Sequence, residues 1–258
     1  SVNRLSSGYR INSAKDDASG LARAETFKVQ ARAMQAAMRN VNDGNSALDI
    51  ADKSAESIVD ILARMSELAA SAAQGSIDTT LRGYYSDEYD KLVAELTRIV
   101  DSAEFGGTKL LTNAVSSITI FIGFKNTAGD QLSISLATLT TGTGGLALSA
   151  GILSGVTGAL SAFDAISAAL VRTNTARSVF GAAGSRLGYA ANNLNVLFTN
   201  WQAAESRIRD VDFAYETSQL VRNHRNDSAS YVIARSGATV AAPFMGAIGA
   251  GIKPAATE

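Results

Sequence analysis

The chain has 258 residues, a formal net charge of −1 and no cysteine. A chain of this length can bury a substantial core in one or two domains. The near-zero charge provides no field that would attract nucleic acid or an anionic membrane. Without cysteine, the sequence excludes disulfide frameworks, thiolate metal sites and thiol catalysis. The first residue is Ser1 and no secretory leader pattern follows it, so we expect a removed beginning or a fragment.

A polar segment, RLSSGYRINSAKDDASGLARAE, occupies residues 4–25. Ser13 followed by Asp16 is typical of a helix capping box, and Asp16 and Asp17 place negative charge where a helix N-terminus is positive. The segment therefore predicts the start of a helix near residue 17.

Apolar residues then recur at alternating steps of four and three, which predicts a single helix over residues 17–73. The pattern shifts near residues 49–51, which indicates a local change of supercoil. At ~1.5 Å per residue this helix would be about 85 Å long, so it needs partner helices. The expected seam comprises Phe27, Ala31, Met34, Met38, Val41 and Leu48, followed by Ala55, Ile58, Leu62, Met65, Ala69 and Ala72.

Two later segments also have helical periodicity. After a loop at residues 75–78, one runs from Tyr85 to Val100 and ends near residues 105–107. The other runs from Ala183 to Val211 in steps of four and three. Both apolar stripes are interpreted as core, since nothing in them indicates a cofactor site.

A different pattern separates these helices. Residues 117–122 and 131–136 alternate in the period of a strand, and residues 125–130 between them have the composition of a turn. We expect a β-hairpin followed by a Gly- and Thr-rich excursion over 138–158. The region would form a small β insert in a helical protein.

Four stretches resemble the core segments of bacterial flagellin. They read RLSSGYRINSAKDDASGLA, MRNVNDGNSALDIAD, EFGGTKLL and ESRIRDVDFAYETSQLVRN, and FIGFKNTAGDQLSISL resembles the hairpin of that family. The resemblance covers residues 1 to about 113 and 159–223 in the correct order. It implies a mainly α fold: an elongated antiparallel helical bundle, or coiled-coil rod, built from N- and C-terminal segments, with a small β-hairpin-containing insert.

The same resemblance implies the division of the chain. Residues 1–112 and 159–223 would form a discontinuous rod domain, and residues 113–158 a short variable insert. Residues 224–258 do not resemble the amphipathic terminal helix of flagellins, so we expect an atypical tail that is divergent, disordered, truncated or a cloning artefact. The N-terminal helix that would pair with a terminal helix is also missing. A fragment of this kind is expected to fold but to polymerise poorly.

The function implied is that of a structural subunit of the flagellar filament, exported without a cleaved signal and assembled extracellularly by self-association. By resemblance its partners would be copies of itself, a flagellar export chaperone and hook-associated proteins. The polar segment would contact neighbouring subunits, whereas an ordinary helix cap would require only Ser13 and Asp16. The expected interface residues are Arg4, Arg10, Asn12, Asp16 and Asp17.

One further surface is implied by the family. Many flagellins are recognised by an innate immune receptor, and the matching positions here are Leu62, Arg64 and Glu88. The alternative is structural: Leu62 lies on the predicted seam, and Asp60 stands four residues before Arg64, the spacing of an ordinary helical ion pair.

Two alternatives stay open at this point. A hook–filament junction protein shares both ends of the flagellin pattern, but it usually has proline where this chain has Ala18. A flagellin-like cell-surface protein that binds a polysaccharide, with the insert as its binding region, is an alternative from another class.

No motif predicts catalysis, a cofactor or a metal. Residues 142–147 fit a dinucleotide fingerprint, but no βαβ units surround them. His224 is the only histidine, no His-Glu-x-x-His motif exists, and Asp210 and Asp212 would point to different helix faces. An ion pair between Glu205 and Arg209, four residues apart, is expected instead. We therefore predict a protein that is not an enzyme and does not span a membrane.

Overall fold

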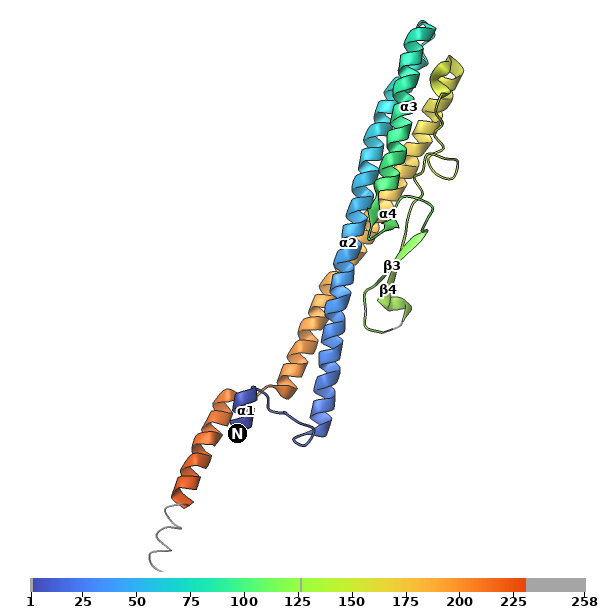
Figure 1. The fold of residues 1–258 in the computed structure, drawn as a ribbon. Coiled ribbons are helices and arrows are strands. Elements are labelled where there is room, and N and C mark those ends of the chain that lie inside the picture. Colours follow the sequence, from blue (N-terminus) through green and yellow to red (C-terminus); the bar gives the residue numbers. More distant parts are fainter. Residues whose placement is uncertain (1, 126, 231–258) are drawn as a thin grey trace, which may run out of the picture. The chain divides into compact units, whose positions relative to one another are not determined.

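The computed structural model describes residues 2–125 and 127–230. Its long helices are α2 (Ala18–Ala72), α3 (Thr79–Ser102) and α4 (Val156–Arg209), and a short helix α1 (Val2–Ser7) precedes them (Figure 1). Residues 213–230 are also helical. The predicted helix over 17–73 is confirmed as α2, and the mainly α fold class with a small β insert is confirmed as well.

Two small antiparallel sheets interrupt the helices. β3 (Ser117–Phe121) pairs with β4 (Gln131–Ser135), which confirms the predicted hairpin. β1 (Glu104–Phe105) pairs with β2 (Thr108–Lys109) around Gly106 and Gly107. Both glycines have positive φ, 56° and 81°, as a tight hairpin turn requires. From the sequence, residues 105–107 were predicted only as the end of a helix. Two short 3-10 helices, η1 (Ala128–Asp130) and η2 (Ile152–Ser154), complete the elements.

The contacts divide the chain into two units. Among the described residues, the smaller unit comprises 2–28 and 201–230, and the larger lies within 29–200. The segment predicted as an insert, residues 113–158, lies inside the larger unit. Of the predicted tail over 224–258, residues 224–230 continue a helix, and residues 231–258 lie outside the described part.

In the larger unit, α3 and α4 run antiparallel to α2 (Figure 1). Their shared core places large side chains of α2 and α3 against mostly small ones of α4, which lets the helices approach closely. The largest fully buried side chains on α2 and α3 are Met34, Ile58, Leu62, Met65, Tyr89 and Leu96. The buried α4 residues of this unit include Ala159, Ala162, Ile166, Ala169, Ala176, Phe180, Ala183, Leu187 and Leu194.

The seam of α2 shifts earlier than predicted. From Leu48 onward the buried positions keep the alternation of three and four through Ala51 and Ala55, so no shift occurs at 49–51. Two steps of three follow each other earlier, over the buried residues Ala31, Met34 and Ala37, whereas the predicted seam residue Met38 is only half-buried; the next buried positions are Val41 and Gly44. Gly44 is buried there because Ile120 of the insert packs against it, and a Cβ on Gly44 would overlap the Ile120 Cδ1 atom. Glycine is not one of the large apolar residues that define such a pattern, so the pattern did not predict that Gly44 lies in the core.

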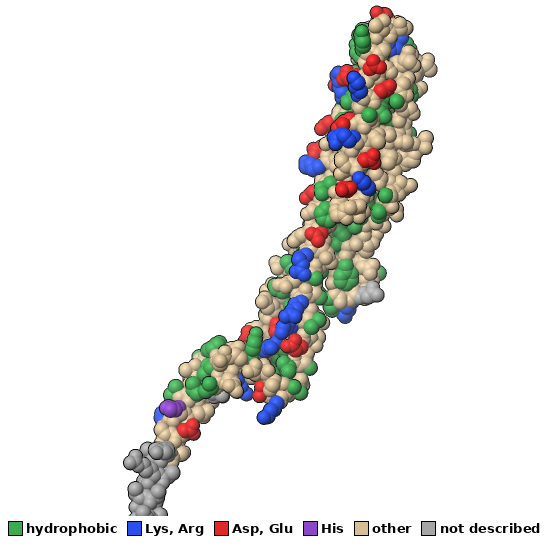
Figure 2. All heavy atoms as spheres, viewed as in Figure 1, with side chains coloured by type: hydrophobic (Ala, Val, Ile, Leu, Met, Phe, Trp, Pro, Cys, Tyr) green, Lys and Arg blue, Asp and Glu red, His purple; other side chains and the backbone are tan. Residues whose placement is uncertain are grey.

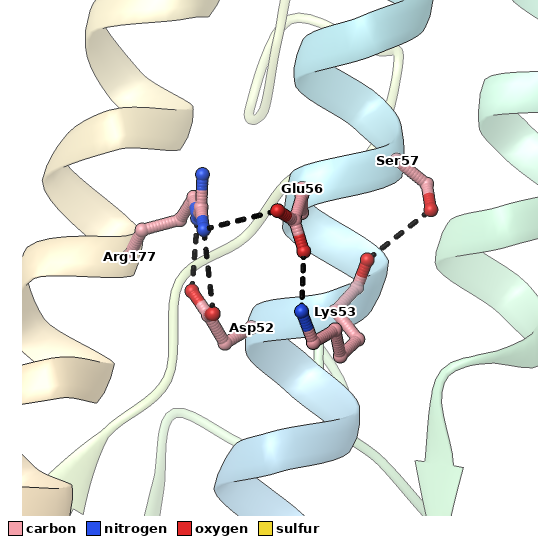
Figure 3. A network of polar contacts seen from close by, with 5 residues as sticks. All are labelled: Asp52, Lys53, Glu56, Ser57 and Arg177. Carbon is pink, nitrogen blue, oxygen red and sulfur yellow. Dashed lines mark hydrogen bonds and ion pairs between the residues drawn. The ribbon is translucent and has the colours of Figure 1, made fainter.

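Polar contacts join α2 to α4 as well (Figure 3). Arg177 on α4 donates from Nε to Asp52 Oδ1 at 2.9 Å, and its Nη2 lies 4.0 Å from Glu56 Oε1. Lys53 forms a second ion pair with Glu56 at 2.7 Å. Its hydrogen bond and charge lower the pKa of the Glu56 carboxyl. The contacts of Arg177 with Asp52 and Glu56 therefore join α4 to α2 at the surface of the bundle.

Within the part of the chain that the structure describes, no helix is long and apolar enough to cross a bilayer.

Candidate subunit interface

The polar segment over 4–17 is held by the end of α4 inside the smaller unit. Val211 N–H donates to Gly8 O at 3.0 Å, and Arg10 N–H donates to Arg209 O at 2.6 Å. Between these bonds Tyr9 and Asp210 form an antiparallel bridge. Two stretches about 200 residues apart in sequence are therefore paired as short extended strands. We call this paired region, residues 8–11 and 209–211, the junction.

The two arginines of the segment bind within the chain. The Arg10 guanidinium donates from Nη2 to Ile208 O at 2.7 Å and to Arg207 O at 3.3 Å. These carbonyls belong to the last turn of α4, where carbonyl groups have no N–H donor within the helix. Arg4 lies 3.9 Å from the Glu216 carboxylate, which is buried. Both side chains thus have a structural role that a simple cap did not explain.

The predicted helix cap is wrong in its residues. α2 begins at Ala18, and its N-cap is Asp17, whose Oδ1 accepts from Gly20 N–H at 2.9 Å and from the Ser19 hydroxyl at 3.1 Å. Asp16 instead closes the turn before the helix: its Oδ2 accepts from the N–H groups of Asn12 and Ser13 at 3.2 and 3.0 Å, and from the Ser13 hydroxyl.

Hydrogen bonds from the backbone lower the pKa of both carboxyls. The N–H of Ser13 is the largest cause for Asp16, and the N–H of Gly20 is the largest cause for Asp17. Both residues are exposed. The negative charges are therefore held in place while staying accessible, which is what a recognition surface requires.

Arg209 contacts several residues of the same region, and most of these contacts were not predicted from the sequence. Its Nη1 donates to Glu25 Oε1 at 2.9 Å, and the predicted pair with Glu205 is confirmed at 3.7 Å. Its guanidinium carbon also lies 4.3 Å from the centroid of the Tyr9 ring, a cation–π contact. Only the four-residue spacing to Glu205 was visible in the sequence.

The outer side of the segment faces solvent. Ile11 is buried at 4% exposure and anchors it, whereas residues 12–17 are all exposed. The structure therefore brings Arg4, Arg10, Asn12, Asp16 and Asp17 into one ordered stretch. Its chemistry is that of a polar contact surface, with hydrogen-bond donors and acceptors but no buried reactive group.

The three receptor-related positions are not equivalent. Leu62 is fully buried in the bundle. Arg64 and Glu88 are brought together across α2 and α3, with Arg64 Nη2 at 2.8 Å from Glu88 Oε1, and Arg64 also pairs with Glu67 at 2.9 Å. Arg64 therefore forms its ion pairs with Glu67 and Glu88. The four-residue spacing in the sequence had suggested Asp60 as its partner instead.

The remaining candidate motifs have structural surroundings. The loop that fits a dinucleotide fingerprint is filled by its own chain: Arg172 donates to Gly145 O, and Gly145 packs on the backbone of Thr140. His224 is exposed on the helix over 213–230. Across residues 2–125 and 127–230, no three acidic or histidine side chains gather closely enough to hold a metal ion.

These features define a mainly helical structural protein with a coiled-coil core and an exposed polar segment over residues 12–17. Comparison with known families is specific. Residues 1–116 match the bacterial flagellin N-terminal helical region, and residues 163–238 match the bacterial flagellin C-terminal helical region. The second match extends into the tail that the sequence analysis considered atypical.

Curated relatives agree with the family matches. A flagellin of Halalkalibacterium halodurans is 36% identical over 89% of this chain and 84% of the relative. Flagellin FlaB1 of Treponema pallidum is 33% identical over 86% of this chain and 82% of the relative. The chain belongs to the bacterial flagellin family, and it is a structural subunit of the flagellar filament. No comparison favours the hook–filament junction or the polysaccharide-binding alternative.

Solved structures are also similar. The crystal structure of Bacillus cereus flagellin has a TM-score of 0.53 and 29% identity, and the match covers 60% of this chain and 88% of that chain. A putative flagellar hook-associated protein of Vibrio parahaemolyticus reaches a TM-score of 0.63 over 76% of this chain and all of that chain. At 12% identity the latter shows the shared fold alone.

Proposed function

We propose that this filament subunit binds copies of itself through the exposed side of the segment over 4–17. The observation that carries the proposal is that the segment is ordered by its own chain while residues 12–17 stay exposed. Binding usually costs free energy for ordering flexible groups at the interface. A segment already held by the junction avoids much of that cost.

The five expected interface residues would have two different roles. Arg4 and Arg10 hold the segment in place through Glu216 and the last carbonyls of α4. Asn12, Asp16 and Asp17 are exposed and would contact the neighbouring subunit. The carboxyl pair would suit a basic or hydrogen-bond-donating surface on that neighbour.

The test is an Asn12→Lys variant of the complete natural protein. We expect its thermal unfolding to match the wild type, because Asn12 is exposed and only its backbone N–H is used in the turn. We expect its seeded polymerisation, followed by light scattering and electron microscopy, to be slowed. Gln202→Lys adds the same charge at another exposed position of the smaller unit and serves as the control. Equal polymerisation of both variants and the wild type would contradict the interface.

The further partners of the family are proposed on the same basis. The subunit would be exported by the flagellar apparatus with an export chaperone, and would meet hook-associated proteins at the filament ends on the cell surface. Secretion of the protein by cells that lack individual chaperone genes tests the first step. A surface glycan as partner would be tested by a glycan array, on which saturable binding must disappear when residues 113–158 are deleted.

Recognition by an innate immune receptor would use the Arg64–Glu88 pair, since both side chains are partly exposed and joined at 2.8 Å. Leu62 would support this surface from beneath. A receptor-activation assay with Arg64→Ala tests the contact, and an unchanged response from a normally folded variant would contradict it.

A further inference from the structure

A groove lies inside the larger unit, between the chain that follows β4 and one side of α4 (Figure 1). Residues 135–139 and 143–145 line it together with positions of α4 from Val171 to Val179. Its volume is about 600 Å³, within the range of roughly 300–1,000 Å³ that is typical of sites for small organic molecules. We call it the α4 groove, and none of the functions described above uses it.

The lining of the α4 groove is largely apolar. Leu139 and Ala176 line it and are buried, so part of the lining belongs to the core of the unit. Val171 and Val179, about two turns apart on α4, are 67% and 41% exposed and also line it. No aromatic side chain is found among the described residues of the lining, so the groove lacks a flat surface on which a base would stack. Such a lining suits a compact aliphatic group.

The groove also has one positive charge without an acidic partner. Arg172 is the only charged residue of its lining. Residues 131–163, which supply the rest of the loop region, contain no Asp, Glu, Lys or Arg. In the upper part of Figure 2, charged side chains gather over α2 and α3 instead. Within residues 2–125 and 127–230, Arg172 forms no ion pair, so its charge is available to a ligand.

The guanidinium of Arg172 is nevertheless held in place. Its Nη1 donates to the carbonyl of Gly145, a buried residue of the loop. That loop is fixed in turn, because Leu146 N–H donates to Thr140 O at 2.6 Å and Leu148 N–H donates to Thr141 O at 2.8 Å. The other N–H groups of Arg172 have no acceptor in the described part of the chain. A donor that is already oriented costs less free energy to use in binding.

We propose that the α4 groove binds a small organic carboxylate with an aliphatic body. The carboxylate would accept hydrogen bonds from Arg172, and the aliphatic body would lie against Leu139, Ala176 and Val179. The hydroxyls of Thr138 and Thr143 also line the groove and have no protein partner among the described residues, so they can donate to the same carboxylate. The inference goes beyond the proposed function, because the site needs neither a second copy nor a receptor.

The ligand class follows from the balance of charge. A carboxylate has one negative charge and two acceptor oxygens, which match a single guanidinium. A phosphate group carries up to two charges at neutral pH, and Arg172 alone would leave part of that charge unpaired in an apolar groove. A neutral ligand would displace water from Arg172 without replacing its hydrogen bonds by a charged acceptor. Each alternative therefore has a cost that a carboxylate avoids.

The test is an NMR titration of the ¹⁵N-labelled 258-residue chain with octanoate, below the concentration at which octanoate forms micelles. We expect saturable shifts of the backbone amides of Thr143, Gly145 and Ala176. Octanamide has the same aliphatic chain without the charge and should bind about tenfold more weakly, since a hydrogen bond to a charged group is lost. Acetate and inorganic phosphate, which lack the aliphatic body, should give no saturable shift.

A first pair of variants removes one positive charge from α4. Arg172→Gln should weaken octanoate binding about tenfold or more. Arg186→Gln is the matched control, because Arg186 is exposed on the same helix and does not line the groove. It should bind octanoate as the wild type does. The amide positions of Leu146 and Leu148 report whether the loop keeps its structure in the Arg172 variant.

A second pair of variants leaves Arg172 unchanged. Val179→Glu places a carboxylate in the lining, where it competes for Arg172 and repels a bound anion, and should also weaken octanoate binding about tenfold. Val196→Glu makes the same change at a position of α4 that is 58% exposed and lies outside the groove. Its affinity for octanoate should equal that of the wild type. This pair decides the question even if the loop loosens in Arg172→Gln.

The outcomes distinguish the site, its ligand class and the proposed function. The absence of a saturable octanoate shift, or equal affinity of Val179→Glu and Val196→Glu, would refute the site. Equal binding of octanamide would refute recognition of the charge, and equal binding of phosphate would show an inorganic anion site instead of a carboxylate site. All these measurements use the monomer, so their failure leaves the proposed assembly intact, and a failure of seeded polymerisation leaves the groove intact.

Discussion

Leu62→Ala tests whether the side chain of Leu62 is packed in the core of the helical bundle. Its side chain is fully buried between the helices, at 0% exposure. Leu62→Ala removes the equivalent of about three methylene groups, or about 2.5 kcal/mol of transfer free energy at ~0.8 kcal/mol each. The cavity left behind adds to this, so we expect a loss of about 3 kcal/mol in the free energy of unfolding.

Urea denaturation of the monomer, followed by far-UV circular dichroism, measures this loss. With a chain of this size, a loss of about 3 kcal/mol lowers the Tm by about 6–12 °C. Arg64→Ala, two residues away, removes exposed ion pairs to Glu67 and Glu88 and should cost about 1 kcal/mol or less. A loss below about 1 kcal/mol for Leu62→Ala, with an unchanged denaturant slope, would refute the packing of α2 against its neighbours.

Three further predictions concern other parts of the fold. Arg82→Ala should destabilise the bundle by about 1–3 kcal/mol in urea denaturation, because this buried guanidinium donates to two carbonyls at the C-terminal end of α2; a variant as stable as the wild type would contradict that role. Gly44→Ala should cost about 1–3 kcal/mol, since the new methyl group overlaps Ile120, and limited proteolysis should then cut the insert faster. Acid should loosen the turn before α2. The folded pKa values of Asp16 and Asp17 lie below 3.8, so their stabilisation is present above that pH and is lost as the pH falls through the folded values. Faster amide exchange of residues 12–20 as the pH falls, after correction for the intrinsic rate, would confirm this.

The parts of the fold that follow from periodicity were predictable from the sequence. The steps of three and four that bury Ile58, Leu62 and Met65 extend over many turns, so the long helix was evident. The hairpin was evident for the same reason, because Ile120, Leu132 and Ile134 alternate with Ser and Thr. Each pattern repeats over neighbouring residues, and its interpretation needs no information about distant parts of the chain.

The junction could not be predicted in this way. Arg10 donates to the carbonyls of Arg207 and Ile208, about 200 residues away. Every residue has a backbone carbonyl, so no residue type in the sequence identifies these two as acceptors. The cap was misassigned for a related reason. Ser13, Asp16 and Asp17 can all accept a helix N–H, and only the position of the first turn decides that Asp17 does so.

Gly44 shows how a glycine inside a helix can be explained by the fold of the chain itself. In a helix it has a cost that must be offset by some gain. At Gly44 the gain lies inside the chain, since Ile120 occupies the space of the missing side chain. At Gly184 and Gly188 that space is open to solvent. The space beside Gly83 of α3 is open as well, so an open glycine inside a helix does not by itself indicate a contact with another molecule.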